Sequence, residues 1–394
     1  MPLAQDVPRV RADPDPAAAM LRRSCLALLS ASVPHVAAAL PDVAKQVVST
    51  PWWPPGTEKK SESVGIISHG FVFMTGMMEV NATVLATAEA EISDIRDIAL
   101  AAGADLNDLV DCLVNAPPGG ASEVRRAFET ALFRAGAGRP SPALTVIEAP
   151  GEYAFFNISI SCVAALREPQ LHRVALQQGP AYGVATRGLL HLQAVGESPP
   201  ERGDAWPLLS DVDTLVRRAG GSGGAKDLVE CTVFLKDIRS APSVRRALAG
   251  GPVLSVVEAG LEEGHEVGLR CVAAVGPGDG VTRVAGGSAV AARKLVFTAG
   301  QLDRQTSGTE AFRSLEQLLG GAGVGLSDVV SCLFFVRDQA KVYDLFAGFY
   351  DAFNVRHPPP PTRDELQARS DCPECKVLAR CVAALPVSDA EVVV

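Results

Sequence analysis

One four-residue segment, Cys-Val-Ala-Ala, occurs three times in this chain at nearly constant spacing. Its cysteines are Cys162, Cys271 and Cys381, and successive copies lie 109 and 110 residues apart. A second set of cysteines recurs in the same order, at the ends of the segments Asp108–Cys112, Asp227–Cys231 and Asp328–Cys332. Self-similarity at a fixed period indicates tandem copies of one folding unit. The sequence therefore predicts three repeats in a single polypeptide.

The three repeats share one order of strand and helix patterns. Short apolar runs end at glycine in 71–76, 189–196 and 295–300, which is typical of a buried strand that closes on a turn. A segment with apolar residues at helical spacing follows each run and ends at Gly103, Gly220 or Gly320. The strand with the recurring cysteine comes next, then a second helix, clearest at 122–135 and 342–353, and two closing strands. The predicted order is β-β-α-β-α-β-β.

The third repeat contains three segments that are more distinctive than the period itself. Residues 295–301 read Leu-Val-Phe-Thr-Ala-Gly-Gln, 334–338 read Phe-Phe-Val-Arg-Asp, and 361–363 read Pro-Thr-Arg. They resemble the Leu-Val-Phe-Thr-Ser-Gly-Gln, Thr-Val-Phe-Val-Lys-Asp and Pro-x-Arg segments of the RidA/YjgF (RutC-like) family of imine deaminases. In the second repeat, Gly179–Tyr182 is similar to the N-terminal Gly-Pro-Tyr-Ser-Gln of that family.

The resemblance implies an α+β fold of the chorismate-mutase-like type. Single-domain members form trimers with a ligand cleft between each pair of neighbours, and cyclic closure makes those clefts equivalent. We therefore expect three tandem RidA-like units that form an intramolecular pseudo-trimer, running as a monomer. The expected boundaries are a partly disordered leader and linker at 1–60, then repeats at 61–168 (the most divergent), 175–276 and 282–388 (the most similar to the family).

The resemblance also implies a reaction, the hydrolysis of 2-imino acids to 2-keto acids and ammonia. In that chemistry an arginine holds the substrate carboxylate, because its planar guanidinium binds both oxygens. Arg363 stands at the Pro-x-Arg position, and counting back 18 residues from the other repeated cysteines gives Val253 and Leu144. Only one cleft is therefore expected to keep the carboxylate anchor. The alternative is an exposed arginine paired with a neighbouring acid.

The glutamate that orients water in the family is missing from all three repeats. Its position, just before each repeated cysteine, holds Ser161, Arg270 and Arg380. Two cations such as Arg363 and Arg380 would disfavour each other unless an anion lay between them. We hypothesise that the cleft binds an anion richer in charge than a 2-imino monocarboxylate, or acts by arginine-assisted attack of water alone.

Three further residues are candidates for substrate binding by the same resemblance. Thr75 has a hydroxyl where the family has a serine before glycine, whereas Val195 and Ala299 do not. Gly300 ends the family-like strand of the third repeat, and Tyr182 corresponds to the family's N-terminal tyrosine. Ordinary packing is the alternative for both Thr75 and Tyr182.

The nine cysteines are an odd number without a secretory signal, so reduced thiols are expected. Cys112, Cys231 and Cys332 suit small buried residues. Cys372 and Cys375 form a lone Cys-x-x-Cys pair in a predicted hairpin, and one pair cannot complete a tetrahedral zinc site. The six histidines show no ligand spacing, so we predict neither a metal nor a cofactor.

Charge and hydropathy narrow the partners. A net charge of −9 argues against nucleic acid, because phosphate backbones require clustered lysine and arginine. The apolar stretch at 25–40 is too short and too interrupted for a membrane span. A cytoplasmic location is expected. The leader at 1–60 is interpreted as disordered and then helical, with a cleaved organelle-targeting segment or an extra element docked on repeat 1 as alternatives.

Two functions from different classes follow. The first is a reactive imine deaminase with one competent cleft around Arg363. The second is a non-catalytic relative that binds small carboxylates or other anions, or a partner protein. Loss of the glutamate favours binding, whereas the intact Pro-x-Arg segment favours at least a ligand.

Overall fold

The computed structural model describes residues 44–50, 63–76, 83–138, 141–149, 158–168, 173–200, 206–277, 281–284, 288–303, 308–338 and 341–387. These residues form three similar mixed α/β units, each built on one sheet. The α+β class and the three tandem units expected from the sequence are confirmed.

The sheet of repeat 1 has the strand order β1-β2-β3-β6-β4-β5. Its strands are β1 (Gln46–Val47), β2 (Gly65–Ser68), β3 (Phe71–Thr75), β4 (Leu109–Ala116), β5 (Ala143–Glu148) and β6 (Ser159–Ala165). Strands β4 and β5 are parallel and the other pairs are antiparallel. The helices are α2 (Val84–Ala101) and α3 (Ala121–Arg134).

Repeats 2 and 3 keep the same order from sheet edge to sheet edge. Repeat 2 contains β7 (Val174–Gln178), β8 (Ala181–Thr186), β9 (Leu189–Gly196), α4 (Pro207–Arg218), β10 (Leu228–Leu235), α5 (Ala241–Ala247), β11 (Val253–Glu258) and β12 (Val267–Ala274). Repeat 3 contains β13 (Thr282–Arg283), β14 (Ala289–Ala292), β15 (Leu295–Asp303), α6 (Gly308–Gly320), β16 (Val329–Val336), α7 (Val342–Phe349), which continues as a π-helix over Tyr350–Arg356, β17 (Thr362–Gln367) and β19 (Val377–Ala384). A short strand, β18 (Arg369–Ser370), leaves repeat 3 and joins the sheet of repeat 2 beside β11.

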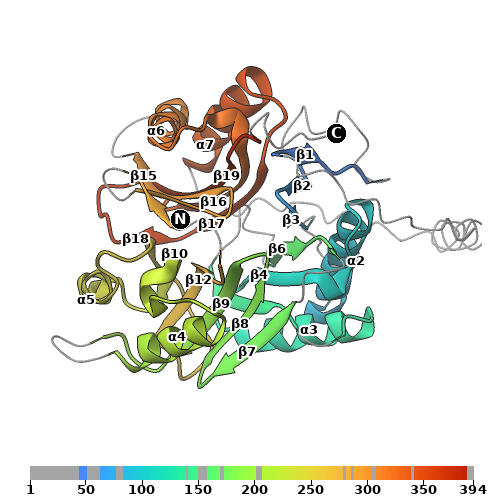
Figure 1. Cartoon of the computed structure of the whole chain (residues 1–394), viewed down its shortest axis with the longest axis vertical. Helices are drawn as coiled ribbons and strands as arrows, with labels where there is room; N and C mark the ends of the chain where they lie inside the picture. The colour runs from blue at the N-terminus through green and yellow to red at the C-terminus, as the bar shows by residue number, and fades with distance from the viewer. Residues whose placement is uncertain are drawn as a thin grey trace, which may run out of the picture. The chain divides into compact units, whose positions relative to one another are not determined.

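Each sheet has a helix face and an inner face. In repeat 1, Ile92, Ile95 and Ile98 of α2 are fully buried at helical spacing, and Thr83 caps the helix by accepting from the Ala86 N–H. Figure 1 shows α2 and α3 along one side of the first sheet, and α6 beside α7 on the third. The helix faces enclose one apolar core per repeat.

The inner faces of the three sheets pack against each other. Two further apolar clusters draw side chains from all three repeats, among them Phe71, Val272 and Phe297 in one and Leu113, Phe234 and Phe335 in the other. Three seams result: β4 and β5 lie against β8 and β9 (seam 1/2), β10 and β11 against β14 and β15 (seam 2/3), and β16 and β17 against β2 and β3 (seam 3/1). The repeats therefore share a centre.

Most predicted elements match the structure, with one addition. The expected strands at 189–196 and 377–384 are β9 and β19 with the same bounds. Each repeat also has an extra short first strand, namely β1, β7 and β13. Strand β1 pairs with β2 although it lies inside the segment expected to be leader, while residues 1–43 and 51–62 of that segment lie outside the described residues.

The recurring cysteines form disulfides, which corrects the expectation of reduced thiols. Each bond joins residues directly opposite on two antiparallel strands: Cys112 with Cys162, Cys231 with Cys271, and Cys332 with Cys381. The spacing of the repeats in the sequence showed that both sets of cysteines recur. It did not show that their strands are neighbours in matching register, which is what brings the sulfur atoms together.

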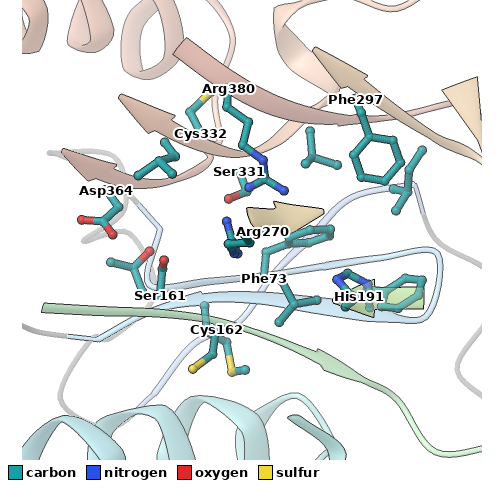
Figure 2. Close-up of a pocket in the computed structure, with 17 residues that line it drawn as sticks. Phe73, Ser161, Cys162, His191, Arg270, Phe297, Ser331, Cys332, Asp364 and Arg380 are labelled. Atoms are coloured by element: carbon teal, nitrogen blue, oxygen red, sulfur yellow. The ribbon is translucent and has the colours of Figure 1, made fainter. Parts of the chain in front are cut away.

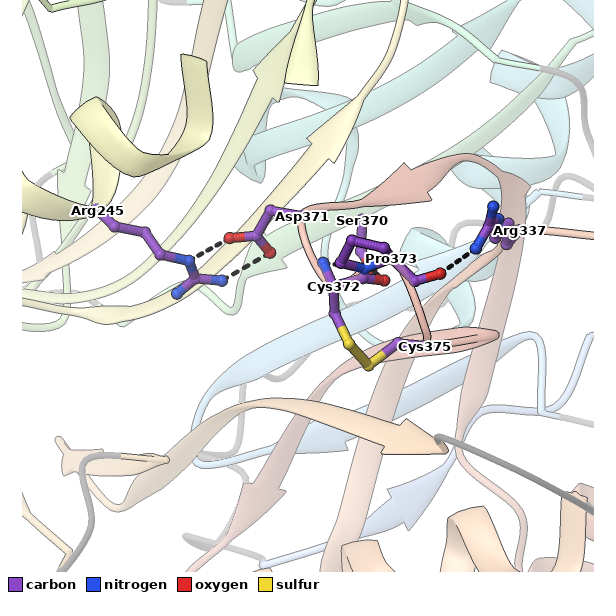
Figure 3. The surroundings of a disulfide bond; sticks show 7 residues. All are labelled: Arg245, Arg337, Ser370, Asp371, Cys372, Pro373 and Cys375. Carbon is purple, nitrogen blue, oxygen red and sulfur yellow. Dashed lines mark hydrogen bonds and ion pairs between the residues drawn. A yellow bond between two sulfur atoms is a disulfide. The ribbon is translucent and has the colours of Figure 1, made fainter. Parts of the chain in front are cut away.

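A fourth disulfide joins Cys372 and Cys375, the Cys-x-x-Cys pair of the predicted hairpin, so these thiols are not reduced either. It closes the turn between β18 and β19 (Figure 3). Asp371, beside this turn, forms an ion pair with Arg245 of repeat 2. The disulfide therefore shapes a turn that contacts the neighbouring repeat.

Within the described ranges, none of the helices is both long enough and apolar enough to cross a bilayer.

Candidate functional site at the seam between repeats 1 and 3

Two sets of equivalent inner-face positions meet at the seams. The first set comprises the residues just before Cys112, Cys231 and Cys332, which are Asp111, Glu230 and Ser331. The second set comprises the residues just before Cys162, Cys271 and Cys381, which are Ser161, Arg270 and Arg380. Because side chains alternate along a strand, these positions face inward while the disulfides face the helices. At each seam, the first position of one repeat lies opposite the second position of the next.

Seams 1/2 and 2/3 each contain a buried ion pair between arginine and acid. At seam 1/2, Arg270 donates from Nε to Asp111 Oδ1 at 3.2 Å and from Nη2 to Oδ2. At seam 2/3, Arg380 approaches Glu230 through Nη2 and Nε, both at 2.7 Å. Burial lowers the pKa of Arg380, but Glu230 and Asp111 outweigh it and hold that pKa above its usual value, so the guanidinium stays charged.

Seam 3/1 has serines at both positions, and a cavity lies there instead of an ion pair. The side chains of Ser161 and Ser331 are much smaller than the arginine and the aspartate or glutamate found at the other two seams. The space that those larger side chains would fill is therefore open. The cavity measures about 30 Å³, room for about two water molecules. Its wall includes Ser161, Ser331, Arg270, Arg380 and Asp364 (Figure 2).

The two arginines are oriented toward this cavity while they bind their acids. Each uses its Nε and Nη2 edge for the carboxylate. Neither Nη1 has a hydrogen-bond partner within the described parts of the chain, and Figure 2 shows both guanidinium groups in the middle of the lining residues. They can therefore still donate to a small molecule.

Asp364 adds a carboxylate to the cavity wall. It lies on the inner face of β17, and the Ser159 Oγ of repeat 1 donates to its Oδ1 at 3.5 Å. In Figure 2, Asp364 and His191 lie on opposite sides of the two guanidinium groups. The cavity thus combines cationic donors, hydroxyl groups and one acid.

His191 adds an imidazole to the wall of the cavity. It is 5% exposed, and its Nδ1 lies 3.9 Å from Asp111 Oδ2. Burial lowers the pKa of His191 to about 4, with Arg270 and Arg380 acting in the same direction and Asp111 opposing them. The ring is therefore neutral at physiological pH.

Arg363, the predicted carboxylate anchor, lies on the helix face of β17. Its Nε is 2.6 Å from Glu365 Oε1, and its guanidinium stacks over Phe346 and Phe349 at 4.2 and 4.9 Å from the ring centroids. It is absent from the described lining of the cavity. Arg363 and Arg380 lie on opposite faces of the sheet, so the anion hypothesised between them has no place there.

Strand register also corrects two equivalences made by counting. Arg363 pairs with Cys332, and the residue that pairs with Cys231 is Leu254, not Val253. The counterpart of Thr75 in repeat 2 is Gln193, which pairs with Arg270, not Val195. The connection between the last two strands of repeat 2 is shorter, which shifts the residue equivalent to Arg363 by one position. Strand β9 is longer than β3, which shifts the residue equivalent to Thr75 by two positions. The position of Arg363 remains aliphatic in both other repeats.

The remaining predicted residues lie in different seams. Thr75 is on the wall of the cavity at seam 3/1. Gly300 is in β15, which faces seam 2/3, and the Tyr182 hydroxyl donates to the Ser141 carbonyl at 2.5 Å across seam 1/2. Each seam is built from residues of two repeats. Thr75, Gly300 and Tyr182, one from each repeat, therefore do not come together in a single site. Ser331, Asp364 and His191 were not predicted, although serine at both paired positions was a readable signal.

No protein-family model matches the sequence, and no curated protein matches it. The structure is similar to a crystal structure of a chorismatase, at 12% identity over 71% of this chain and 93% of that chain, with a TM-score of 0.50. It is also similar to NMB1025 of Neisseria meningitidis, a member of the YjgF protein family, at 18% identity over 32% of this chain and 96% of that chain, with a TM-score of 0.25. A crystal structure of yeast Mmf1 is similar at 14% identity over 31% of this chain and 99% of that chain, with a TM-score of 0.26. At 12% identity the chorismatase likeness concerns the fold.

Proposed function

We propose that this chain binds a small carboxylate-bearing metabolite in the cavity at seam 3/1. The observation that carries the proposal is the pair Ser161 and Ser331, which opens a cavity at the one seam that lacks the arginine–acid pair. Arg270 and Arg380 stand at its wall with their Nη1 groups available. Guanidinium groups are well suited to carboxylates, and hydroxyl groups add neutral donors.

The size of the cavity limits the ligand. About 30 Å³ suits a molecule of very few atoms, so an acid of three or four carbons requires the seam to widen. Seam 3/1 is the one between the first and last repeats, which no chain segment joins directly. Widening there strains no linker, in contrast to seams 1/2 and 2/3.

The test is to rebuild the missing ion pair. The double variant Ser161→Arg/Ser331→Asp gives seam 3/1 the residues of seam 1/2 and fills the cavity at no change in net charge. Ligand-observed NMR titration with propionate and pyruvate should detect binding to the wild type and at least a tenfold loss in the variant, with an unchanged circular dichroism spectrum. Unchanged affinity in a folded variant would place the ligand elsewhere.

A second candidate is hydrolysis of a 2-imino acid, and Asp364 favours it. A carboxylate at the wall can accept a proton from a water that attacks the imine carbon, which the absent family glutamate would otherwise do. Collapse of the carbinolamine would release ammonia and leave a 2-keto acid. The assay follows loss of 2-iminobutanoate generated in situ by threonine dehydratase. A rate equal to the buffer control would leave binding as the only function. A rate above the control that is unchanged in Asp364→Asn would show hydrolysis without a role for Asp364.

A further inference from the structure

Equivalent positions of the three central strands carry Phe73, His191 and Phe297. The strand register identifies them, because they pair with Val163, Val272 and Val382, which follow the repeated cysteines. All three line the cavity. Repeat 2 thus has an imidazole where the other two repeats have a phenyl ring of similar shape.

The imidazole of His191 is unusual in its surroundings. Within the described part of the chain, neither Nδ1 nor Nε2 has a hydrogen-bond partner, although the side chain is over nine-tenths buried. Its neighbours include the ring of Phe71, at 5.7 Å between centroids. The charged groups around it, Asp111, Arg270 and Arg380, are engaged with one another or with Glu230.

Packing alone does not account for this histidine. A buried polar group without a partner costs free energy that phenylalanine at the same position would not. A neutral imidazole offers one donor and one acceptor, and His191 lines the cavity beside the rings of Phe71, Phe73 and Phe297. A bound molecule with a polar group beside the imidazole would satisfy it.

We infer that His191 is a specificity-determining residue that hydrogen-bonds an oxo or hydroxyl group of the ligand. The inference rests on the proposed function, in which the carboxylate of the same molecule is held by the arginines and serines. The ligand class is then small oxo or hydroxy acids, not plain carboxylic acids. The imidazole donates to an oxo group or accepts from a hydroxyl group.

The experiment compares three acids of equal carbon number on the full-length chain. Dissociation constants for pyruvate, lactate and propionate are measured by ligand-observed NMR with the wild type and His191→Phe, the residue found at both equivalent positions. We expect the wild type to prefer pyruvate or lactate over propionate by about tenfold, the worth of one hydrogen bond. In the variant the preference should vanish, with propionate affinity unchanged.

The outcomes separate the two proposals. A wild type that binds none of the three acids overturns the proposed function and this inference with it. Binding of all three with equal affinity, or a preference that persists in His191→Phe, overturns the role of His191 alone. If His191→Phe does not fold, His191→Leu removes the same hydrogen bonds with a smaller side chain and decides between these results.

Discussion

At the scale of single residues, the same inner-face position holds one half of an ion pair at two seams and borders an open cavity at the third. Arg270 and Arg380 are buried, and each is held by an acid from the preceding repeat. Removing one partner of such a pair leaves a buried charge, which costs far more than the pair contributes. Serine at both positions avoids that cost and leaves space instead.

This comparison predicts a strong coupling between Glu230 and Arg380. Glu230→Ser should destabilise the fold by about 3–5 kcal/mol, because it leaves the guanidinium of Arg380 buried without its carboxylate. The double variant Glu230→Ser/Arg380→Ser reproduces seam 3/1 and should cost less than that single change. Urea unfolding of both variants and of Arg380→Ser gives the coupling energy. Additive effects would show that the pair acts as two independent residues.

His191 predicts a loss of stability in mild acid. Its folded pKa of about 4 lies below the unfolded value of 6.5, so the unfolded chain binds more protons between these values. Stability is therefore retained above pH 6.5 and falls as the pH drops toward 4, by about 2 kcal/mol at pH 5. Urea unfolding at pH 7.5 and 5 should show this difference for the wild type relative to His191→Phe. Equal pH dependence in both proteins would contradict it.

At the scale of elements, strand β17 shows why neighbouring residues have unrelated roles. Asp364 faces the cavity, whereas Arg363 and Glu365 face the helices and stand where repeats 1 and 2 have apolar side chains. The same alternation places the disulfides on the helix face and the serines on the inner face.

The placement of Arg363 gives a prediction that separates it from the cavity. Arg363→Leu copies Leu144 and Leu254 and should leave carboxylate binding unchanged, but lower stability by removing the ion pair between Arg363 and Glu365. Adding Glu365→Val, which copies Val146 and Val256, should recover part of that loss. NMR titration and urea unfolding measure the two effects. Loss of binding in Arg363→Leu would support the anchor predicted from the sequence instead.

The cross-strand disulfides predict the thiol content of the protein. Of nine cysteines, eight are paired, which leaves Cys25 outside the described residues. Protein purified without reductant and alkylated in denaturant should carry one modification by mass spectrometry, and nine after reduction. Each cross-strand bond closes a loop of 40 to 50 residues, worth roughly 4 kcal/mol in the chain-entropy model. Nine modifications without reduction would show that the bonds do not form.

At the scale of the whole molecule, fusion of three units allows one seam to differ from the other two. At seam 3/1, side chains that precede β2 of repeat 1 form hydrogen bonds with backbone carbonyls of repeat 3, mainly in the proline-rich segment before β17. Lys45 Nζ donates to the carbonyls of Pro359 at 2.7 Å and Ser327 at 3.1 Å, and Ser63 Oγ donates to Pro360 at 2.6 Å. In a symmetric trimer of identical chains, a substitution at one seam would be present at all three seams, so no seam could differ from the others.

The shared centre predicts that the chain is a monomer in solution. Its inner faces already cover each other in two clusters, so no second chain is needed to bury them. Size-exclusion chromatography with light scattering should give a mass near the 41.1 kDa of one chain. A mass near three times that value would mean that the units associate between chains.

The sequence by itself determined the number of units, their α+β class and most of their elements, because period and hydrophobic alternation are local signals along the chain. It also showed that no repeat keeps the expected glutamate. Tertiary structure decided which face each residue occupies and which partner it meets: Arg380 pairs with Glu230, 150 positions away, and Ser331 lies opposite Ser161. Strand pairing and register fix those contacts, and one residue of shift turns a side chain to the other face of the sheet.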